Sequence, residues 1–541
     1  MSETLASSTR RMAVGTVASR ATGFLRTAMI AGVLGVLGVG DAYNVANTIP
    51  NIVYDLLLGG VLSSVVVPLL VRAAAEEGDE AEACTQRLLT LTIAVLGAAC
   101  LVLVVLAPQL VHLYAGGLRP REEQLAVVFA RLCLPQVAFY GIGAILGALL
   151  NVRGRFAPPM WAPVVNNGVV IGTALLFLLL PGPRHDGGPL LTGAQVALLG
   201  LGTTLGIVGQ TVALLPSLRA AGFRWRLRRD LRGVGLGTAG RLARWVLLYV
   251  VANQVAFFVV VRLATDKAHV ADGRGYTSFV NAFVLWQLPH AIVAVSVITA
   301  LLPGMSRAAA EGRTADLRAI LNRGLRLTST VLVPATAAYV VLGPAVATVV
   351  LAHGRVSVPQ ARYMGLLLAV LALGLVPFSA YQLQLRAFYA MQDTRTPTLV
   401  NLAVNVTMIG ADLVLYALLS PGHRVLGLAV GQSLSYAVGL AVCSRVLGRR
   451  LDGLDGALAV RTAVRCLVAA APAGLAGLAV ARAAESVLGR GPAAAAATLL
   501  LAGATLAACY VALARRMRVH ELDEVAGPLL RRLAGRPTRR R

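Results

Sequence analysis

The stretch that decides the fold is Met12–Gly38, MAVGTVASRATGFLRTAMIAGVLGVLG, which is apolar or small except for a few polar residues and two arginines. It is long enough to cross the hydrocarbon core of a bilayer as a helix, and similar runs recur along the chain. The 541 residues are 57% hydrophobic and 13% charged, with a mean hydropathy of +0.74. Soluble domains contain about 25% charged residues, and membrane β-barrels show short alternating strands. The sequence therefore predicts an all-α polytopic membrane protein.

Fourteen apolar runs predict fourteen transmembrane helices, at approximately residues 12–38, 42–71, 88–112, 124–150, 157–181, 192–218, 235–265, 275–306, 317–350, 363–389, 397–419, 425–447, 459–481 and 492–514. With these spans, 32 of the 49 basic residues lie on the side of both termini and ten on the opposite side. Because Lys and Arg are enriched in cytoplasmic loops, we expect both termini in the cytoplasm. The net charge of +25 thus reflects topology, and no nucleic-acid partner is expected.

Two patterns that occur twice indicate an internal duplication. Pro68-Leu-Leu-Val-Arg72-Ala-Ala-Ala-Glu76 returns 235 residues later as Pro303-Gly-Met-Ser-Arg307-Ala-Ala-Ala-Glu311, and Pro158 with Asn166 returns 239 residues later as Pro397 with Asn405. Six predicted helices separate the copies, so two six-helix lobes should be related by a pseudo-two-fold axis along the membrane normal. We expect an N-lobe over 1–219, a C-lobe over 220–450, helices 13 and 14 over 451–516, and a basic cytoplasmic tail over 517–541.

Charged residues inside the first two spans are candidate functional residues. Arg20 and Arg26 lie within the first span, where an arginine costs at least about 2.5–3.5 kcal/mol unless it faces water or a partner. Guanidinium groups bind phosphates well, so both are candidate ligands of a diphosphate; the alternative is that they extend to the lipid headgroups. Asp41 is a candidate gate residue and Asp55 a candidate counter-ion for the two arginines. An ordinary interfacial acid explains Asp41, and a helix-joining ion pair explains Asp55, equally well.

The remaining spans offer fewer candidates. Arg262, near the end of the seventh span, is the best partner for the two arginines in diphosphate binding, and an interfacial role is an equal alternative. Asn281 and Gln287 in the eighth span are suited to hydrogen-bonding sugars or neighbouring helices. Asp412 in the eleventh span leaves a structural hydrogen bond and a cation site both open. Interior prolines, at positions 50, 68, 135, 289, 303, 334 and 377, predict kinked helices.

Several function classes are excluded by what the sequence lacks. The six cysteines show no metal-site spacing, so neither a zinc site nor a disulfide framework is expected. The only lysine, Lys267, follows Asp266, so there is no Walker A motif. The loops are too short for a catalytic domain, and paired acid–base residues of an intramembrane transferase are missing. We therefore expect a transporter without enzyme activity or cofactor, driven by an ion gradient, the membrane potential or mass action, with the coupling ion unknown.

Six motifs carry a family resemblance: Ser19-Arg20-Ala-Thr-Gly23-Phe24-Leu-Arg26, Asp41-Ala-Tyr43, Ile49-Pro50-Asn51, residues 60–68, residues 287–303, and Ala387-Phe-Tyr-Ala-Met-Gln-Asp393-Thr-Arg395-Thr-Pro397. They resemble the MurJ/MviN family, the lipid II flippases of bacterial cell-wall synthesis, in the superfamily that also contains MATE drug exporters. An excess of 48 arginines over one lysine indicates GC-rich coding of the kind found in actinobacteria.

The resemblance implies two six-helix lobes around a cationic cavity, with helices 13 and 14 shaping a hydrophobic groove for the lipid tail. It implies that Arg20 and Arg26 engage the diphosphate and that Asp41 is an acid of the outer gate. Asn51, with Asn281 and Gln287, is a candidate polar contact for the headgroup.

The chain also departs from the family pattern. Where many members have a basic residue after the Pro-Asn pair, this chain has Tyr54 and Asp55, and Val284 stands in place of the arginine of helix 8. Arg262 and Arg274 are the candidates to replace that arginine.

The sequence thus predicts a flippase that moves an undecaprenyl-diphosphate-linked peptidoglycan precursor, lipid II above all, across the bacterial cytoplasmic membrane by alternating access. One alternative is a flippase for another lipid-linked glycan. The other is a non-transporting scaffold that recruits cell-wall synthesis or division proteins through its basic loops; such proteins are candidate partners in either case. A MATE-like exporter of cationic drugs is disfavoured because an arginine-lined cavity repels cations.

Overall fold

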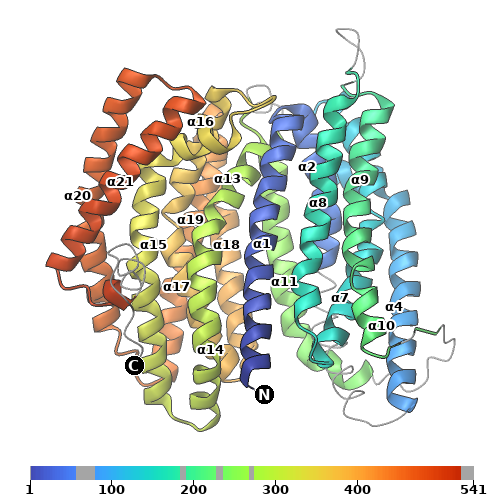
Figure 1. Cartoon of the computed structure of the whole chain (residues 1–541), viewed down its shortest axis with the longest axis horizontal. Coiled ribbons are helices and arrows are strands. Elements are labelled where there is room, and N and C mark those ends of the chain that lie inside the picture. The colour runs from blue at the N-terminus through green and yellow to red at the C-terminus, as the bar shows by residue number, and fades with distance from the viewer. Residues whose placement is uncertain are drawn as a thin grey trace. The chain divides into compact units, whose positions relative to one another are not determined.

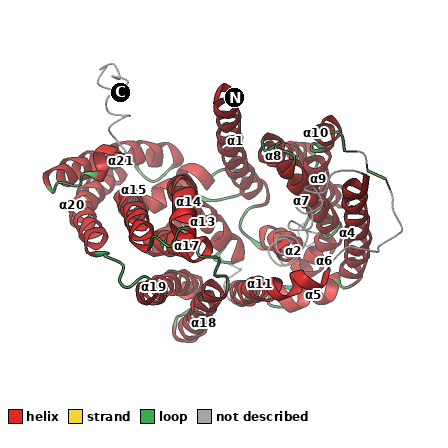
Figure 2. Ribbon diagram, turned by 90° about the horizontal axis from the view of Figure 1, so that it is seen from below, coloured by secondary structure: helices red, strands yellow, loops and turns green. Residues whose placement is uncertain are grey.

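The computed structural model describes residues 2–55, 79–182, 190–223, 225–226, 236–266 and 273–524. Over these ranges the chain is helical and contains no strand, which confirms the predicted all-α class. It divides into two compact units, Met1–Thr277 and Ser278–Arg541. Each unit is a bundle of long helices (Figures 1 and 2).

Unit 1 is built from ten helices in the described ranges, together with the first residues of α13. They are α1 (Ser2–Leu34), α2 (Gly38–Asp55), α4 (Asp79–Val105), α5 (Ala107–Ala115), α6 (Pro120–Cys133), α7 (Gln136–Val152), α8 (Ala157–Leu179), α9 (Gly193–Val212), α10 (Leu215–Ala220) and α11 (Leu236–Ala264). Helix α8 packs against α1 and α9, and α2 packs against α6 and α7. The polar residues of the candidate site are therefore carried on α1 and α2, at the side of a bundle formed by α6 to α9.

Unit 2 contains most of α13 (Tyr276–Pro289) and the helices that follow it. They are the π-helix η2 (His290–Ala294), α14 (Val295–Ala310), α15 (Thr314–Leu351), α16 (Val358–Ala372), α17 (Leu375–Ala390), α18 (Arg395–Leu418), η3 (Pro421–His423), α19 (Arg424–Arg450), α20 (Ala457–Leu488) and α21 (Pro492–Arg516). Helix α15 is the centre of this unit, because α14, α16, α17, α20 and α21 all pack against it. Helices α20 and α21 lie side by side along α15 (Figures 1 and 2).

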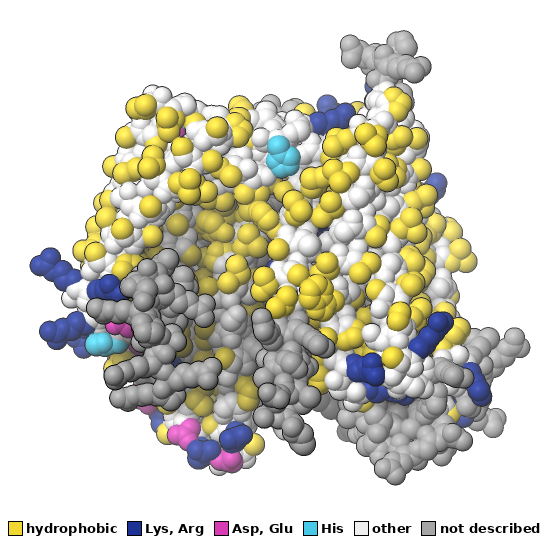
Figure 3. All heavy atoms as spheres, in the orientation of Figure 1, with side chains coloured by type: hydrophobic (Ala, Val, Ile, Leu, Met, Phe, Trp, Pro, Cys, Tyr) yellow, Lys and Arg dark blue, Asp and Glu magenta, His cyan; other side chains and the backbone are white. Residues whose placement is uncertain are grey.

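Among the described residues, eleven helical segments are long and apolar enough to cross a membrane, or twelve if the bent pair α16 and α17 forms one span. Helix α1 is not among the eleven, and the continuation of α2 beyond Asp55 lies outside the described residues. The total of fourteen spans stays a prediction. Hydrophobic side chains are distributed widely over the described part of the face shown in Figure 3. Residues such as Leu179 and Leu418 are more than 70% exposed, which is costly in water and suits contact with lipid tails.

Prolines accompany three of the helix breaks, as predicted. Pro135 separates α6 from α7, Pro289 immediately precedes the π-helix, and Pro377 follows the 48° bend between α16 and α17. A proline has no backbone N–H and displaces the carbonyl four residues earlier, so it weakens the helical ladder at these points. Helices α2, α14 and α15, in contrast, continue through Pro50, Pro303 and Pro334 without a break.

The repeat patterns fall partly on described residues. Pro158 and Pro397 each stand in the first turn of a helix, α8 and α18, and Asn166 and Asn405 are both buried eight residues later. Proline suits this position because the first-turn N–H has no helical partner. The segment Pro68–Glu76 lies outside the described residues, and the lobe boundaries inferred from the duplication stay a prediction.

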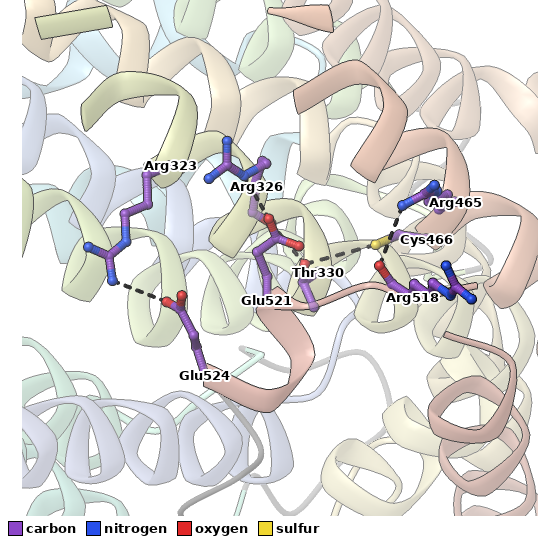
Figure 4. A network of polar contacts seen from close by, with 8 residues as sticks. All are labelled: Arg323, Arg326, Thr330, Arg465, Cys466, Arg518, Glu521 and Glu524. Carbon is purple, nitrogen blue, oxygen red and sulfur yellow. Dashed lines mark hydrogen bonds and ion pairs between the residues drawn. The ribbon is translucent and has the colours of Figure 1, made fainter. Parts of the chain in front are cut away.

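The hairpin of α20 and α21 is fastened to the rest of unit 2 at both ends. At one end Arg362 of α16 binds Glu485 of α20 through two hydrogen bonds of 2.8 and 3.2 Å. At the other, the segment after α21 returns to α15, where Arg326 donates to Glu521 at 2.6 Å (Figure 4). Leu522 of this segment is buried in the core formed with α20 and α21. The first residues of the predicted tail, up to 524, are therefore packed against the bundle.

Candidate functional site

The two arginines of α1 lie on different faces of the helix. Arg26 follows Arg20 by six residues, which places the side chains about 120° apart around the helix axis. Arg20 is exposed, whereas Arg26 is half-buried and close enough to the phenols of Tyr43 and Tyr140 to interact with them electrostatically. Neither arginine forms an ion pair with an acidic residue in the described part of the chain. Both guanidinium groups therefore lack a described carboxylate that an anionic ligand would have to displace.

Helix α1 is held in register by α8. The amide of Asn167 on α8 donates to the backbone carbonyl of Ser19 at 3.2 Å and to the hydroxyl of Thr22 at 3.0 Å. A Cβ at Gly23 would make an ordinary contact, 3.5 Å, with the Asn167 side chain. These contacts fix the rotation of the helix segment that carries Arg20 and Arg26.

Asn51 lies in a polar cluster between α2 and α7. The hydroxyl of Tyr140 donates to Asn51 Oδ1 at 3.0 Å, and the Tyr54 ring lies 4.5 Å from the Tyr140 ring. The Asn51 amide donates to the carbonyl of Asn47. Tyr140 thus contacts Asn51 and lies within electrostatic range of Arg26.

Asp55 stands apart from the two arginines. Its carboxylate is exposed and accepts a hydrogen bond of 3.4 Å from Gln254 of α11. Asp55 thus links α2 to α11 through this hydrogen bond. It forms no ion pair with Arg20 or Arg26 among the described residues, so its predicted role as their counter-ion stays a prediction.

Asp41 is fully buried and bonds to the start of α13. Its Oδ1 accepts the backbone N–H of Thr277 at 2.7 Å. Thr277 is the second residue of α13, where a helical N–H has no acceptor within its own helix. Asp41 therefore caps α13 from another helix. The sequence predicted a gate residue at Asp41, and in this structure the partner of its carboxylate is a backbone N–H.

Two further contacts accompany this cap. Asn44 donates to Thr277 Oγ1 at 3.1 Å, and the hydroxyls of Thr48 and Tyr276 lie 2.8 Å apart. We call Asp41, Asn44, Thr48, Tyr276 and Thr277 the α2–α13 latch. All five belong to unit 1, and the three α2 residues are spaced along one face of that helix.

The second oxygen of Asp41 has an unusual environment. Oδ2 is buried and has no hydrogen-bond partner among the described residues. Gly275 leaves room for it, since a Cβ there would lie 2.7 Å from this oxygen. Buried Glu122 is the nearest other carboxylate, and it is bound by Arg119 through an Nε hydrogen bond of 2.8 Å. One oxygen of this buried carboxylate accepts a hydrogen bond and the other accepts none, so the cost of burying Asp41 is only partly offset. Such a contact is suited to breaking during a conformational change.

The remaining predicted site residues lie elsewhere. Arg262 is exposed in the last turn of α11, and both it and Arg274 belong to unit 1, so neither is a ligand supplied by the second unit. Asn281 is buried on α13 with no hydrogen-bond partner for its amide nitrogen among the described residues, and Gln287 is exposed on the same helix. Within the described ranges no three His, Cys, Asp or Glu side chains are grouped so that they could hold a metal ion.

Sequence reasoning did not single out Tyr140, Gln254 or Thr277. Each is an ordinary polar residue of an apolar helix, and its role comes from a partner more than 80 residues away.

Comparison with known proteins decides the family. The sequence profile of the family described as lipid II flippase MurJ matches residues 30–490, which is most of the chain. The chain belongs to the MurJ family.

Curated MurJ relatives match over most of their own length. A probable lipid II flippase MurJ of Rhizobium meliloti (strain 1021) is 26% identical over 404 residues, covering 73% of this chain and 72% of the relative. The lipid II flippase MurJ of Burkholderia cenocepacia is 27% identical over 429 residues, covering 77% and 79%.

Solved structures show the same fold. A lipid II flippase MurJ in an inward closed conformation superposes with a TM-score of 0.73 at 17% identity, covering 94% of this chain and 99% of that chain. An inward-facing MATE-family multidrug transporter gives a TM-score of 0.64 at 15% identity, covering 83% of this chain. The MurJ-family fold thus extends beyond the 30–490 match to nearly the whole chain.

Proposed function

We propose that this MurJ-family protein is a lipid II flippase: it moves the undecaprenyl-diphosphate-linked precursor from the inner to the outer leaflet by alternating access. The observation that carries the proposal is the pair Arg20 and Arg26, two guanidinium groups of the first predicted span with no carboxylate partner among the described residues. A diphosphate would supply the negative charge that pairs with these two cations. Guanidinium–phosphate hydrogen bonds are among the strongest polar contacts in proteins.

The half-buried Arg26 is the stronger candidate for direct diphosphate contact. It lies within electrostatic range of the phenols of Tyr43 and Tyr140. Asn51 accepts from Tyr140 and lies next to this position, where it can hydrogen-bond the adjoining sugar. Exposed Arg20 supplies the first contact as the headgroup enters.

The α2–α13 latch supplies the gate. In its closed form Asp41 caps α13, and two neutral hydrogen bonds support it. Because Thr277 stands in the first turn of α13, release of the latch frees this turn from α2, and we assign the opening of the gate to this step. A cargo can bias this step only through unequal affinity for the two states.

The transport proposal includes the topology and the energy source. Both termini face the cytoplasm of a bacterial cell, the N-lobe and C-lobe follow the duplication at 1–219 and 220–450, and residues 451–516 shape the groove for the lipid tail. No chemical step is needed, so a membrane potential or an ion gradient biases the cycle, as in a secondary transporter.

Complementation tests this proposal. In a bacterium depleted of its own flippase, the wild-type chain should restore growth and outer-leaflet lipid II, whereas Arg20→Ala and Arg26→Ala should not at equal membrane abundance. Arg219→Ala, an exposed arginine at the end of α10, is the matched control and should behave as wild type. Growth without outer-leaflet lipid II would indicate that the substrate is another lipid-linked glycan. Full activity of both α1 variants would show that Arg20 and Arg26 do not form the diphosphate site.

A further inference from the structure

Helix α21 of unit 2 is held at its two ends by different kinds of connection. It begins after a turn that contains Gly489 and Gly491, both of which lie in open space, and Gly489 has a φ of +83°, which glycine adopts without strain. After its last residue the chain turns back onto α15 as residues 517–524, which we call the strap (Figure 4). A helix joined in this way can pivot about the glycine turn when the strap leaves α15.

The strap docks through one half-buried ion pair and two apolar side chains. Arg326 of α15 donates to Glu521 at 2.6 Å, and the two side chains are 23% and 13% exposed. Val519 and Leu522 are buried in the core that α15, α20 and α21 share. A segment with so few buried contacts can undock without unfolding the helices around it.

The strap begins with a strained turn. Arg518 has a φ of +56°, in the left-handed region that residues with a Cβ rarely adopt. The Val519 N–H donates to the carbonyl of Ala514 at 3.0 Å, which closes a helix end of the kind that usually has glycine at this position. Arg465 of α20 donates to the Arg518 carbonyl at 3.4 Å. Such strain persists only where surrounding contacts impose it, and it is common in segments that switch.

The buried face of α21 is formed mainly by small side chains. Its buried residues are Ala495, Thr498, Ala502, Leu506, Tyr510 and Ala514. The two large ones, Leu506 and Tyr510, lie in the half nearer the strap, where the Tyr510 hydroxyl donates to the Thr330 carbonyl of α15 at 2.8 Å. Large side chains make many more contacts than Ala or Thr, so the contacts that resist a pivot are concentrated beside the strap.

Cys466 of α20 lies in the space that the strap covers. It is fully buried in the same core as Val519, and its sulfur lies 4.0 Å from Thr330 Oγ1 (Figure 4). Departure of the strap and of the adjoining end of α21 would therefore expose this thiol.

We propose that the strap is a reversible clasp. Docked, it holds the end of α21 against α15 and α20; undocked, it lets α21 pivot about the turn at 489–491 and opens the seam between α21 and α15. This inference goes beyond the proposed function and rests on contacts within unit 2. In a lipid II flippase the clasp controls access of the lipid tail to the groove that residues 451–516 shape. The clasp itself is measurable without any cargo, so its failure and the failure of the proposed function are distinguishable.

The test is the rate at which N-ethylmaleimide modifies Cys466 in the full-length protein in nanodiscs, followed by mass spectrometry. Glu521→Ala removes the charge-assisted bond to Arg326 and should speed modification by about tenfold or more. Glu524→Ala is the matched control in the same strap, because its pair with Arg323 at 3.2 Å is more than half exposed. It should change the rate by less than about fivefold.

Cys443 distinguishes release of the strap from a general loosening of the unit. It is also fully buried, but in a separate core that includes α17, α18 and α19. Its modification should be unchanged in Glu521→Ala. Equal acceleration at Cys443 and Cys466 would overturn the clasp, and so would an unchanged rate at Cys466.

Arg518 gives an independent check, because its side chain is exposed. Arg518→Val should speed modification of Cys466, since a β-branched side chain opposes the left-handed backbone of the docked strap. Arg518→Gly loses the same guanidinium group but favours this backbone, so modification should be no faster than in the wild type. Equal acceleration by both changes would contradict the role of the turn.

Discussion

Removal of the Asp41 carboxylate should expose the first turn of α13 to hydrogen exchange. The Thr277 N–H has Asp41 Oδ1 as its acceptor at 2.7 Å and no acceptor within its own helix. A hydrogen bond to a charged group contributes about 1.5–3 kcal/mol. Since every 1.4 kcal/mol is a factor of ten, Asp41→Ala should speed exchange of this amide by about 10- to 150-fold.

The assay is hydrogen–deuterium exchange with mass spectrometry on the protein in nanodiscs, following the peptide that covers residues 275–281. Asp41→Asn keeps an oxygen acceptor and should give an intermediate rate. Gly275→Ala keeps the carboxylate but places a Cβ 2.7 Å from Asp41 Oδ2, so it should also speed exchange.

Asp55→Ala is the matched control, because it removes an exposed carboxylate of the same helix that has only a 3.4 Å contact with Gln254. It should leave exchange at 275–281 unchanged. Unchanged exchange in Asp41→Ala would refute the latch, and an equal increase in Asp55→Ala would show a general loosening of α2.

Three further changes test the packing of unit 2. Arg326→Ala, which breaks a half-buried pair with its glutamate, should lower the free energy of unfolding clearly more than Arg323→Ala, whose pair is exposed and contributes about 0–1 kcal/mol; chemical denaturation of both variants measures the difference. Gly431→Ala should destabilise by about 1–3 kcal/mol, because its Cβ would lie 2.1 Å from the buried Asp412 carboxylate; Gly410→Ala, which meets open space, should not, and thermal melting separates them. Burial raises the pKa of Asp393, but hydrogen bonds from Thr396 and its ion pair with an arginine outweigh this and hold the pKa below the ordinary 3.8. The wild type should therefore be more stable than Asp393→Asn at neutral pH, and melting curves should converge as the pH falls below 3.8 through the folded pKa; a constant difference would contradict this assignment.

The all-α membrane class followed from the sequence because bilayer thickness sets a length that apolar runs such as residues 157–181 meet directly. The positions of several helix breaks could also be predicted from the sequence, because a proline disrupts the helix in which it lies. Pro135 and Pro289 act on their own helix, so their effect is readable without knowing the neighbours.

Long-range partners could not be read in this way. Asp41 was singled out as a candidate gate residue, but its partner is a backbone N–H 236 residues away, and a backbone group leaves no trace in side-chain composition.

The most direct test of the central claim is lipid II transfer in vesicles that contain only the purified protein and an imposed membrane potential. A membrane-impermeant reagent that modifies the lipid II headgroup reports the fraction that has crossed. We predict transfer well above protein-free vesicles for the wild type and a loss of transfer for Arg26→Ala. Transfer no faster than in protein-free vesicles, with correctly folded wild-type protein, would contradict the account.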